Sequence, residues 1–97
     1  MKIVITDLAE EDIDIIYDYI FATFGQDAAL NFLEKINFAL SLISDNPEVG
    51  RIQKRDKNKR GFIVTNRTQV LYRIDLANKR IVVLSFFDVR QHPDRRH

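Results

Sequence analysis

The side chains best suited to chemistry stand at the end of the chain, in the segment DVRQHPDRRH over residues 88–97. A histidine titrates near neutral pH and can act as an acid or a base, so His92 and His97 are the first candidates. His92 precedes Pro93, which favours an extended or turn backbone, and His97 is the final residue. Because holding a chain end in catalytic geometry costs conformational entropy, we predict that this segment is a binding rim with solvated histidines.

No other catalytic, metal or cofactor site is predicted. The chain has no Cys, and no third His or nearby carboxylate pair completes the ligand spacing of a metal site. It also lacks a Gly-rich phosphate loop, a Ser-His-Asp set and paired catalytic carboxylates. Asp14 and Asp18 share one face of a predicted helix, where we interpret them as solvating charges. We therefore expect no catalytic residue, no metal and no cofactor.

Charge is divided unevenly between the two halves of the chain. Residues 1–48 hold two Lys and ten Asp or Glu, a net charge of −8, whereas residues 49–97 hold thirteen Lys or Arg and four Asp, a net charge of +9. This division predicts an acidic surface and a separate basic one, the latter suited to an anionic partner. The alternative is that the charges simply solvate two faces.

The pattern of apolar residues predicts one strand and two helices in the first half of the chain. KIVIT, residues 2–6, is rich in β-branched residues, as is typical of a strand. Asp7 and Glu10 have the spacing of a capping box, and the apolar residues after them recur at helical spacing, which predicts a helix over residues 8–24. A second helix is predicted over residues 27–45. The turn between the helices is short, so they are expected to form an antiparallel hairpin.

The hydrophobic period changes from 3.6 to 2 near residue 60. Three strands are predicted, over residues 61–66, 69–76 and 80–88, and short turns join them into an antiparallel meander. The expected fold is a two-layer α+β domain with the order strand, helix, helix, meander, and with the helical hairpin on one face of the sheet. We expect residues 1–97 to form one domain.

Four motifs stand along the chain in an order and spacing that carry a family resemblance. They are AEEDIDIIYDYI (9–20), NPEVGR (46–51), VLYRI (70–74) and FDVRQHP (87–93). With the order of the elements, they resemble the RelE/ParE superfamily of toxins from type II toxin–antitoxin modules, and more closely its ParE branch. The resemblance implies a small toxin that a cognate antitoxin holds inactive. RelE-like members cut messenger RNA on the ribosome, whereas ParE-like members inhibit DNA gyrase and are not known as nucleases.

Two positions favour the ParE branch. Gln69 stands where RelE-like toxins often carry an arginine, and Asp88 stands where many relatives carry His. A glutamine cannot neutralise a phosphate, and a carboxylate could act as a base but would repel RNA, so the ribonuclease pattern is incomplete. We interpret the chain as a ParE-like toxin that inhibits DNA gyrase by binding rather than by catalysis. The alternatives are a metal-independent, ribosome-dependent messenger-RNA endonuclease and an inactive relative that binds antitoxin.

Arginines are the strongest binding candidates, because the guanidinium fork suits carboxylates and phosphates. Arg73 is expected on the less buried face of the middle strand. The alternative for Arg73 is an ion pair with Asp75, and the alternative for Arg90 is one with Asp88. The basic run over residues 54–60 either steers an anionic partner or solvates a loop. The candidates for target or antitoxin binding are Arg51, Arg60, Arg73, Arg90 and Gln91.

The expected partners are a cognate antitoxin and DNA gyrase, with the ribosome and messenger RNA as the alternative target. We expect a hetero-oligomer with the antitoxin, with a homodimer as an option. An extended antitoxin segment is expected across the sheet or along the helix pair, with acidic residues against the basic half. The N-terminus lacks an apolar signal region, and no apolar run approaches the roughly 18–20 residues of a membrane span. We therefore expect a cytoplasmic protein without a membrane partner.

Overall fold

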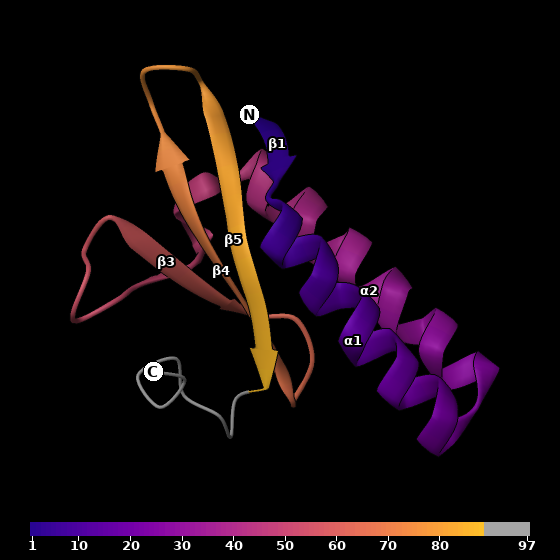
Figure 1. Cartoon of the computed structure of the whole chain (residues 1–97). Coiled ribbons are helices and arrows are strands. Elements are labelled where there is room, and N and C mark those ends of the chain that lie inside the picture. The colour runs from indigo at the N-terminus through magenta and orange to yellow at the C-terminus, as the bar shows by residue number, and fades with distance from the viewer. Residues whose placement is uncertain (89–97) are drawn as a thin grey trace.

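The computed structural model describes residues 1–88 of the chain. A strand comes first, two helices follow, and further strands complete the chain (Figure 1). In chain order the elements are β1 (Lys2–Ile5), α1 (Asp7–Phe24), α2 (Gln26–Asp45), the 3-10 turn η1 (Pro47–Val49), β2 (Arg51–Ile52), β3 (Lys59–Ile63), β4 (Thr68–Asp75) and β5 (Arg80–Asp88).

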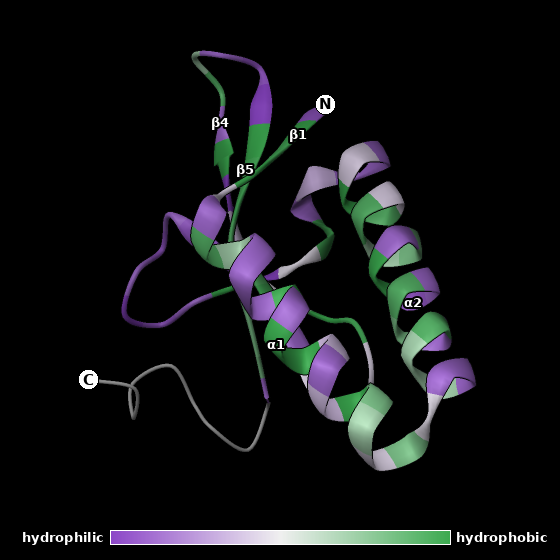
Figure 2. Cartoon of the chain, turned by 45° about the vertical axis from the view of Figure 1, so that its right-hand side comes forward, coloured by the Kyte–Doolittle hydropathy of each residue, from purple (hydrophilic) through white to green (hydrophobic). Residues whose placement is uncertain are grey.

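The strands form one sheet in the order β1-β5-β4-β3-β2. β1 lies parallel to β5 at one edge, and the other neighbouring strands are antiparallel. The helices α1 and α2 run side by side on one face of the sheet (Figures 1 and 2). The predicted two-layer α+β fold and its three-stranded meander are therefore confirmed. The short strand β2, which pairs with β3, is not among the predicted strands.

Several predicted boundaries differ from the observed ones by one to three residues, and hydrogen bonds explain the end of β3, the start of α1 and the end of β1. The strand predicted over 61–66 begins at Lys59, and it ends at Ile63 because the amides of the next two residues bond to the carbonyl of Thr68 in the turn. Thr6, rather than the predicted Asp7, caps α1, since its hydroxyl accepts a hydrogen bond from the amide of Ala9 at 3.2 Å. Because Thr6 caps the helix, β1 ends at Ile5, one residue before its predicted end.

The two faces of the sheet differ in what covers them. Val70 and Tyr72 of β4 are fully buried with the helices, and so is Val83 opposite Tyr72. A β-bulge adds Leu84 to β5, so that Val83 and Phe86 share this face although they are three positions apart. The alternate residues of the strands lie on the other side, which neither helix covers and which we call the open face. Within residues 1–88, no helix is long and apolar enough to cross a membrane.

Candidate functional site

A buried tyrosine holds the turn that leads into β2. The hydroxyl of Tyr72 accepts a hydrogen bond from the amide of Gly50 at 2.9 Å and donates one to the carbonyl of Pro47 at 2.7 Å. A side chain at Gly50 has no room, because its Cβ would lie 2.6 Å from this hydroxyl oxygen. Burial raises the pKa of Tyr72, although the Gly50 amide and the charge of Arg60 partly offset the rise. The phenol is therefore neutral at physiological pH and serves as an anchor.

Arg60, one of the predicted binding residues, holds the same turn. Its Nη1 atom donates hydrogen bonds to the carbonyl of Glu48 at 3.0 Å and to the carbonyl of Gly50 at 2.9 Å. Arg60 lies opposite Tyr72 in the register of β3 and β4, so its side chain stands on the helix side of the sheet. The structure gives Arg60 this structural role, and its part in target binding stays a prediction.

Two other predicted residues, Arg51 and Arg73, lie on the open face. Arg51 lies opposite Gly61 on β3, and Arg73 of β4 lies opposite Lys59. The side chains of Arg51 and Arg73 form no hydrogen bond or ion pair within residues 1–88. Lys59 pairs with Asp56 at 3.5 Å. Arg51, Lys59 and Arg73 thus lie near one another on the open face, and sequence reasoning missed Lys59 because the run of charges hides the start of β3.

Two glutamines cover the glycine beside these cations. A Cβ on Gly61 would clash with Nε2 of Gln69 and would lie 2.8 Å from Nε2 of Gln53. Gln53 also donates a hydrogen bond to the carbonyl of Arg51 at 2.9 Å. Gln69, at the position of the nuclease arginine, therefore adds an amide donor to the open face. A neutral amide can bond to an anion but cannot neutralise its charge.

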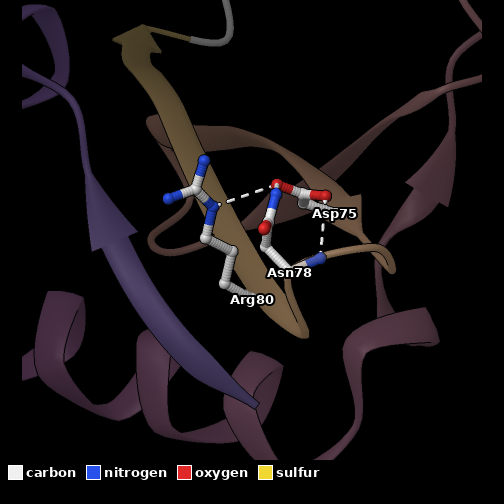
Figure 3. Close-up of polar contacts among 3 residues, drawn as sticks. All are labelled: Asp75, Asn78 and Arg80. Carbon is white, nitrogen blue, oxygen red and sulfur yellow. Dashed lines mark hydrogen bonds and ion pairs between the residues drawn. The ribbon is translucent and has the colours of Figure 1, made fainter.

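The carboxylate of Asp75 belongs to the turn between β4 and β5 (Figure 3). It accepts hydrogen bonds from the side-chain amide of Asn78 at 2.9 Å and from Nε of Arg80 at 3.0 Å. The bond from Asn78 and, after it, the contact with Arg80 hold the pKa of Asp75 below its ordinary value, because both favour the charged form. The ion-pair partner of Asp75 is therefore Arg80 and not Arg73, and Asp75 is a weak proton acceptor at neutral pH.

The predicted residues near the chain end, Arg90, Gln91, His92 and His97, lie outside the described residues. Within residues 1–88, no three His, Asp or Glu side chains converge as a metal site. This part of the chain contains no histidine, so around Arg51, Lys59 and Arg73 it contributes cations and amides to the open face. Such a surface can bind an anion, and it offers no imidazole as an acid or a base.

A groove of about 680 Å³ lies between the helical hairpin and the turn joining β3 to β4. Three apolar side chains of α1 line it while remaining open to solvent, namely Ile15 (64% exposed), Tyr19 (57%) and Phe24 (65%). Figure 2 shows apolar residues at the end of the hairpin where α1 passes into α2. Lys35 and Arg67 also line the groove, and their side chains form no hydrogen bond or ion pair within residues 1–88. The groove suits an apolar segment that carries acidic residues.

The groove was missed by sequence reasoning, although a signal was present. Ile15 and Tyr19 stand four positions apart, outside the apolar stripe that predicts packing of α1, and so form a second stripe. Phe24 continues the helical spacing of Ile16 and Ile20, which predicts packing, yet it is exposed, because the far end of α1 extends past the sheet (Figure 1). A helix with more apolar residues than one packed face requires is the pattern that indicates a second contact surface.

Comparisons with known proteins identify the family. The model of the ParE toxin of the type II toxin–antitoxin system, parDE, matches residues 3–93. No curated protein matches the chain. Among solved structures, the chain is similar to the chromosomal ParDE toxin–antitoxin system from P. aeruginosa, with a TM-score of 0.77 and 23% identity, covering 92% of this chain and 96% of that chain.

Two more distant structures share the fold. A YoeB/ParE toxin from Agrobacterium tumefaciens gives a TM-score of 0.65 at 19% identity, covering 91% of this chain and 98% of that chain. The toxin–antitoxin complex RelBE2 from Mycobacterium tuberculosis gives a TM-score of 0.64 at 21% identity, covering 90% of this chain and 95% of that chain. These likenesses establish the fold, and the family match spans most of the sequence. The chain therefore belongs to the ParE family of toxins of type II toxin–antitoxin systems.

Proposed function

We propose that this ParE-family toxin acts by binding, that its target is DNA gyrase, and that a cognate antitoxin neutralises it. The observation that favours binding over cleavage is the composition of the open face. Arg51, Lys59 and Arg73 stand there beside two glutamines, and residues 1–88 contain no histidine.

Metal-free RNA cleavage needs more than such a surface supplies. A base must activate the ribose 2′-hydroxyl, an acid must protonate the leaving oxygen, and cations must stabilise the phosphate in the transition state. Arginine and lysine provide the cations but accept no proton at neutral pH. Tyr72 is buried on the opposite side of the sheet, and Asp75 is held ionised in a turn. The cations of the open face, with Tyr72 and Asp75 held in these roles, thus favour recognition over acid–base chemistry.

The messenger-RNA endonuclease is the second candidate, because the three cations of the open face also suit a phosphate. Its acid and base would come from Asp88 at the end of β5 or from residues 89–97, which contain both histidines of the chain. One experiment separates the two functions.

The experiment is induced expression in a bacterial host, with plasmid supercoiling and transcript integrity followed in the same cells. We expect relaxed plasmid and intact transcripts, and purified gyrase should lose supercoiling activity when the chain is added. Cut transcripts with normal supercoiling would replace gyrase inhibition with ribonuclease activity. Normal growth with both readouts unchanged would indicate an inactive relative that binds antitoxin.

For the antitoxin, we propose that an amphipathic segment occupies the groove between the hairpin and the β3–β4 turn. Its apolar side chains would cover Ile15, Tyr19 and Phe24, and its acidic residues would face Lys35 and Arg67. Burial of exposed apolar surface provides most of the affinity, whereas the charge pairs speed association and weaken with salt.

The antitoxin proposal is tested with the short protein encoded by the neighbouring reading frame. Ile15→Ser and Tyr19→Ser should each weaken its binding about tenfold or more, as loss of a central apolar anchor does. Phe38→Ser is the matched control, because Phe38 is 68% exposed on α2 and does not line the groove. If Phe38→Ser weakened binding as much as Tyr19→Ser, or if binding were indifferent to salt, the antitoxin would lie elsewhere.

A further inference from the structure

Cations gather at one edge of the open face. Lys59 and Arg73 occupy directly opposed positions of β3 and β4, where like charges repel each other. Arg51 stands on the neighbouring strand, opposite Gly61. Because neighbouring strands lie about 4.8 Å apart and alternate residues about 6.8 Å apart, the Cα atoms of the three cations span about 12 Å. An anion placed over these side chains would relieve the repulsion.

The loop between β2 and β3, residues 53–58, continues this surface past the edge of the sheet (Figure 1). Its residues Lys54 and Lys57 are exposed and form no hydrogen bond or ion pair within residues 1–88. The nearby Asp56 is already engaged, since it accepts a hydrogen bond from the amide of Asn58 and pairs with Lys59. We call this surface the basic edge, consisting of Arg51, Lys54, Lys57, Lys59 and Arg73.

Amide donors complete the basic edge. The Nε2 atoms of Gln69 and Gln53 lie over Gly61, whose missing side chain leaves them room. A phosphodiester oxygen accepts hydrogen bonds and donates none, so a surface of guanidinium, ammonium and amide groups matches it in both charge and hydrogen bonding.

The placement of the aromatic residues decides which nucleic acid fits. The exposed aromatic side chains of residues 1–88 lie on the helices, and Phe87, opposite Gln69 on the open face, is only 5% exposed. Residues 89–97 contain no Phe, Tyr or Trp. Single-strand binders stack bases on exposed aromatic rings, whereas a duplex presents phosphates that cations alone can hold. The basic edge offers cations without exposed aromatic rings, and this composition suits a duplex.

We propose that the basic edge binds the phosphate backbone of double-stranded DNA. Contacts limited to phosphates position a protein on the duplex without reading its sequence, so the binding is expected to be sequence-independent. The inference rests on the proposed function only for its biological role. On a gyrase that holds DNA, the basic edge would contact the DNA while other surfaces of the toxin contact the protein.

The test measures fluorescence anisotropy of a labelled short DNA duplex with the full chain made by cell-free synthesis. If three or four phosphates are neutralised, the affinity should fall by about 40- to 150-fold between roughly 50 and 200 mM salt. The variant Arg51→Gln, Lys59→Gln, Arg73→Gln should lose at least about tenfold in affinity and most of this salt dependence. The control variant Lys2→Gln, Lys35→Gln, Lys79→Gln removes the same charge outside the basic edge and should bind like the parent.

Several results would overturn the inference. An equal loss in the two triple variants would show that net charge alone governs binding, and tighter binding of a single strand would contradict the duplex. Displacement of the duplex by polyglutamate at equal charge concentration would assign the basic edge to an acidic protein segment. A chain that binds the duplex but leaves gyrase supercoiling unchanged would remove the gyrase target and keep the basic edge as a DNA-binding surface.

Discussion

The carboxylate of Asp12 on α1 accepts a hydrogen bond from the backbone amide of Phe86 on β5 at 3.0 Å, although 74 positions separate the two residues. β1 pairs with β5 only as far as Val83, and Phe86 lies beyond that point. The hydroxyl of Thr6 lies within 2.9 Å of the carbonyl oxygen of Val83. Side chains at the start of α1 thus continue the edge of the sheet where β1 ends, which fixes the helical hairpin against β5.

Replacing Asp12 should therefore destabilise the fold. Asp12→Ala leaves the buried amide of Phe86 without this acceptor, and the free energy of unfolding should fall by about 1–3 kcal/mol. Asp12→Asn keeps an acceptor oxygen and should cost less. Urea unfolding measures the free energy of unfolding of both Asp12 variants. Asp14→Ala is the control, because Asp14 is exposed on the same helix. A loss for Asp14→Ala as large as that for Asp12→Ala would refute the role of this hydrogen bond.

Tyr72→Phe tests the anchor of the turn before β2. The change keeps the buried ring but removes both hydrogen bonds of the hydroxyl, so the free energy of unfolding should fall by about 1–3 kcal/mol. The raised pKa adds a pH dependence. Above the ordinary value of 10.0 the unfolded state loses the phenolic proton first, so the stability of the wild type should fall as the pH rises further. The difference in melting temperature between the wild type and Tyr72→Phe should therefore shrink above that pH. A difference that stays constant would contradict the raised pKa of Tyr72.

Asp75 should contribute a pH dependence of the opposite sign. Its pKa is lowered in the fold, so its contribution to stability is present above the ordinary value of 3.8 and is lost as the pH falls through the folded value. Asp75→Asn should lower the melting temperature at pH 7, and this deficit should diminish in acid. A deficit that stays unchanged down to strongly acidic pH would show that the carboxylate charge is irrelevant to the turn.

At the chain end, His92→Ala and His97→Ala should leave toxicity nearly intact, because the proposed function needs no proton transfer. Arg90→Ala should weaken toxicity, since loss of an interfacial charged partner costs about 2–5 kcal/mol and lowers affinity more than tenfold. A growth assay compares the three variants, after circular dichroism has shown that each is folded. Loss of toxicity in His92→Ala, together with cut transcripts in the parent, would restore the ribonuclease.

Local patterns were enough to predict the order of elements, because helix and strand periods depend on neighbouring residues. The bulge at Leu84 was not predictable in this way, since it depends on register with β4, and it places both Val83 and Phe86 in the core although they stand three positions apart. The role of Arg60 depends equally on tertiary contact. Its sequence setting is a basic run, and only the fold brings it to the carbonyls of Glu48 and Gly50.

The same limit applies to the candidate site. Sequence placed Arg73 on the less buried side of its strand, and the structure agrees, because Arg73 alternates with the buried Tyr72. The groove beside Ile15 and Tyr19 could not be located, since its other wall is the turn between β3 and β4, about fifty positions away in the chain. The pairing of segments that are distant in the chain decides which side chains share a surface. Residue spacing within one segment does not predict this pairing.

The last prediction compares one substitution at two buried glycines. A Cβ at Gly50 would lie 2.6 Å from the hydroxyl oxygen of Tyr72, 2.8 Å from its ring and 3.0 Å from the carbonyl oxygen of Gly61, none of which can move freely. A Cβ at Gly61 meets the ends of Gln53 and Gln69, which can rotate away. Gly50→Ala should therefore lower the free energy of unfolding by about 1–3 kcal/mol, as overpacking does, and Gly61→Ala by less than about 1 kcal/mol.

Urea unfolding of the two glycine variants provides the comparison, and DNA binding adds a second readout. Because Gly61→Ala displaces the amide donors of the open face, it should weaken duplex binding while the fold stays intact. Gly50→Ala crowds the ring of Tyr72 and the backbone rather than the two glutamine side chains, so its folded fraction should bind the duplex like the parent. Equal destabilisation by both substitutions would mean that the buried ring of Tyr72 yields as easily as a glutamine side chain, and the turn would then not be held as rigidly as its two hydrogen bonds indicate.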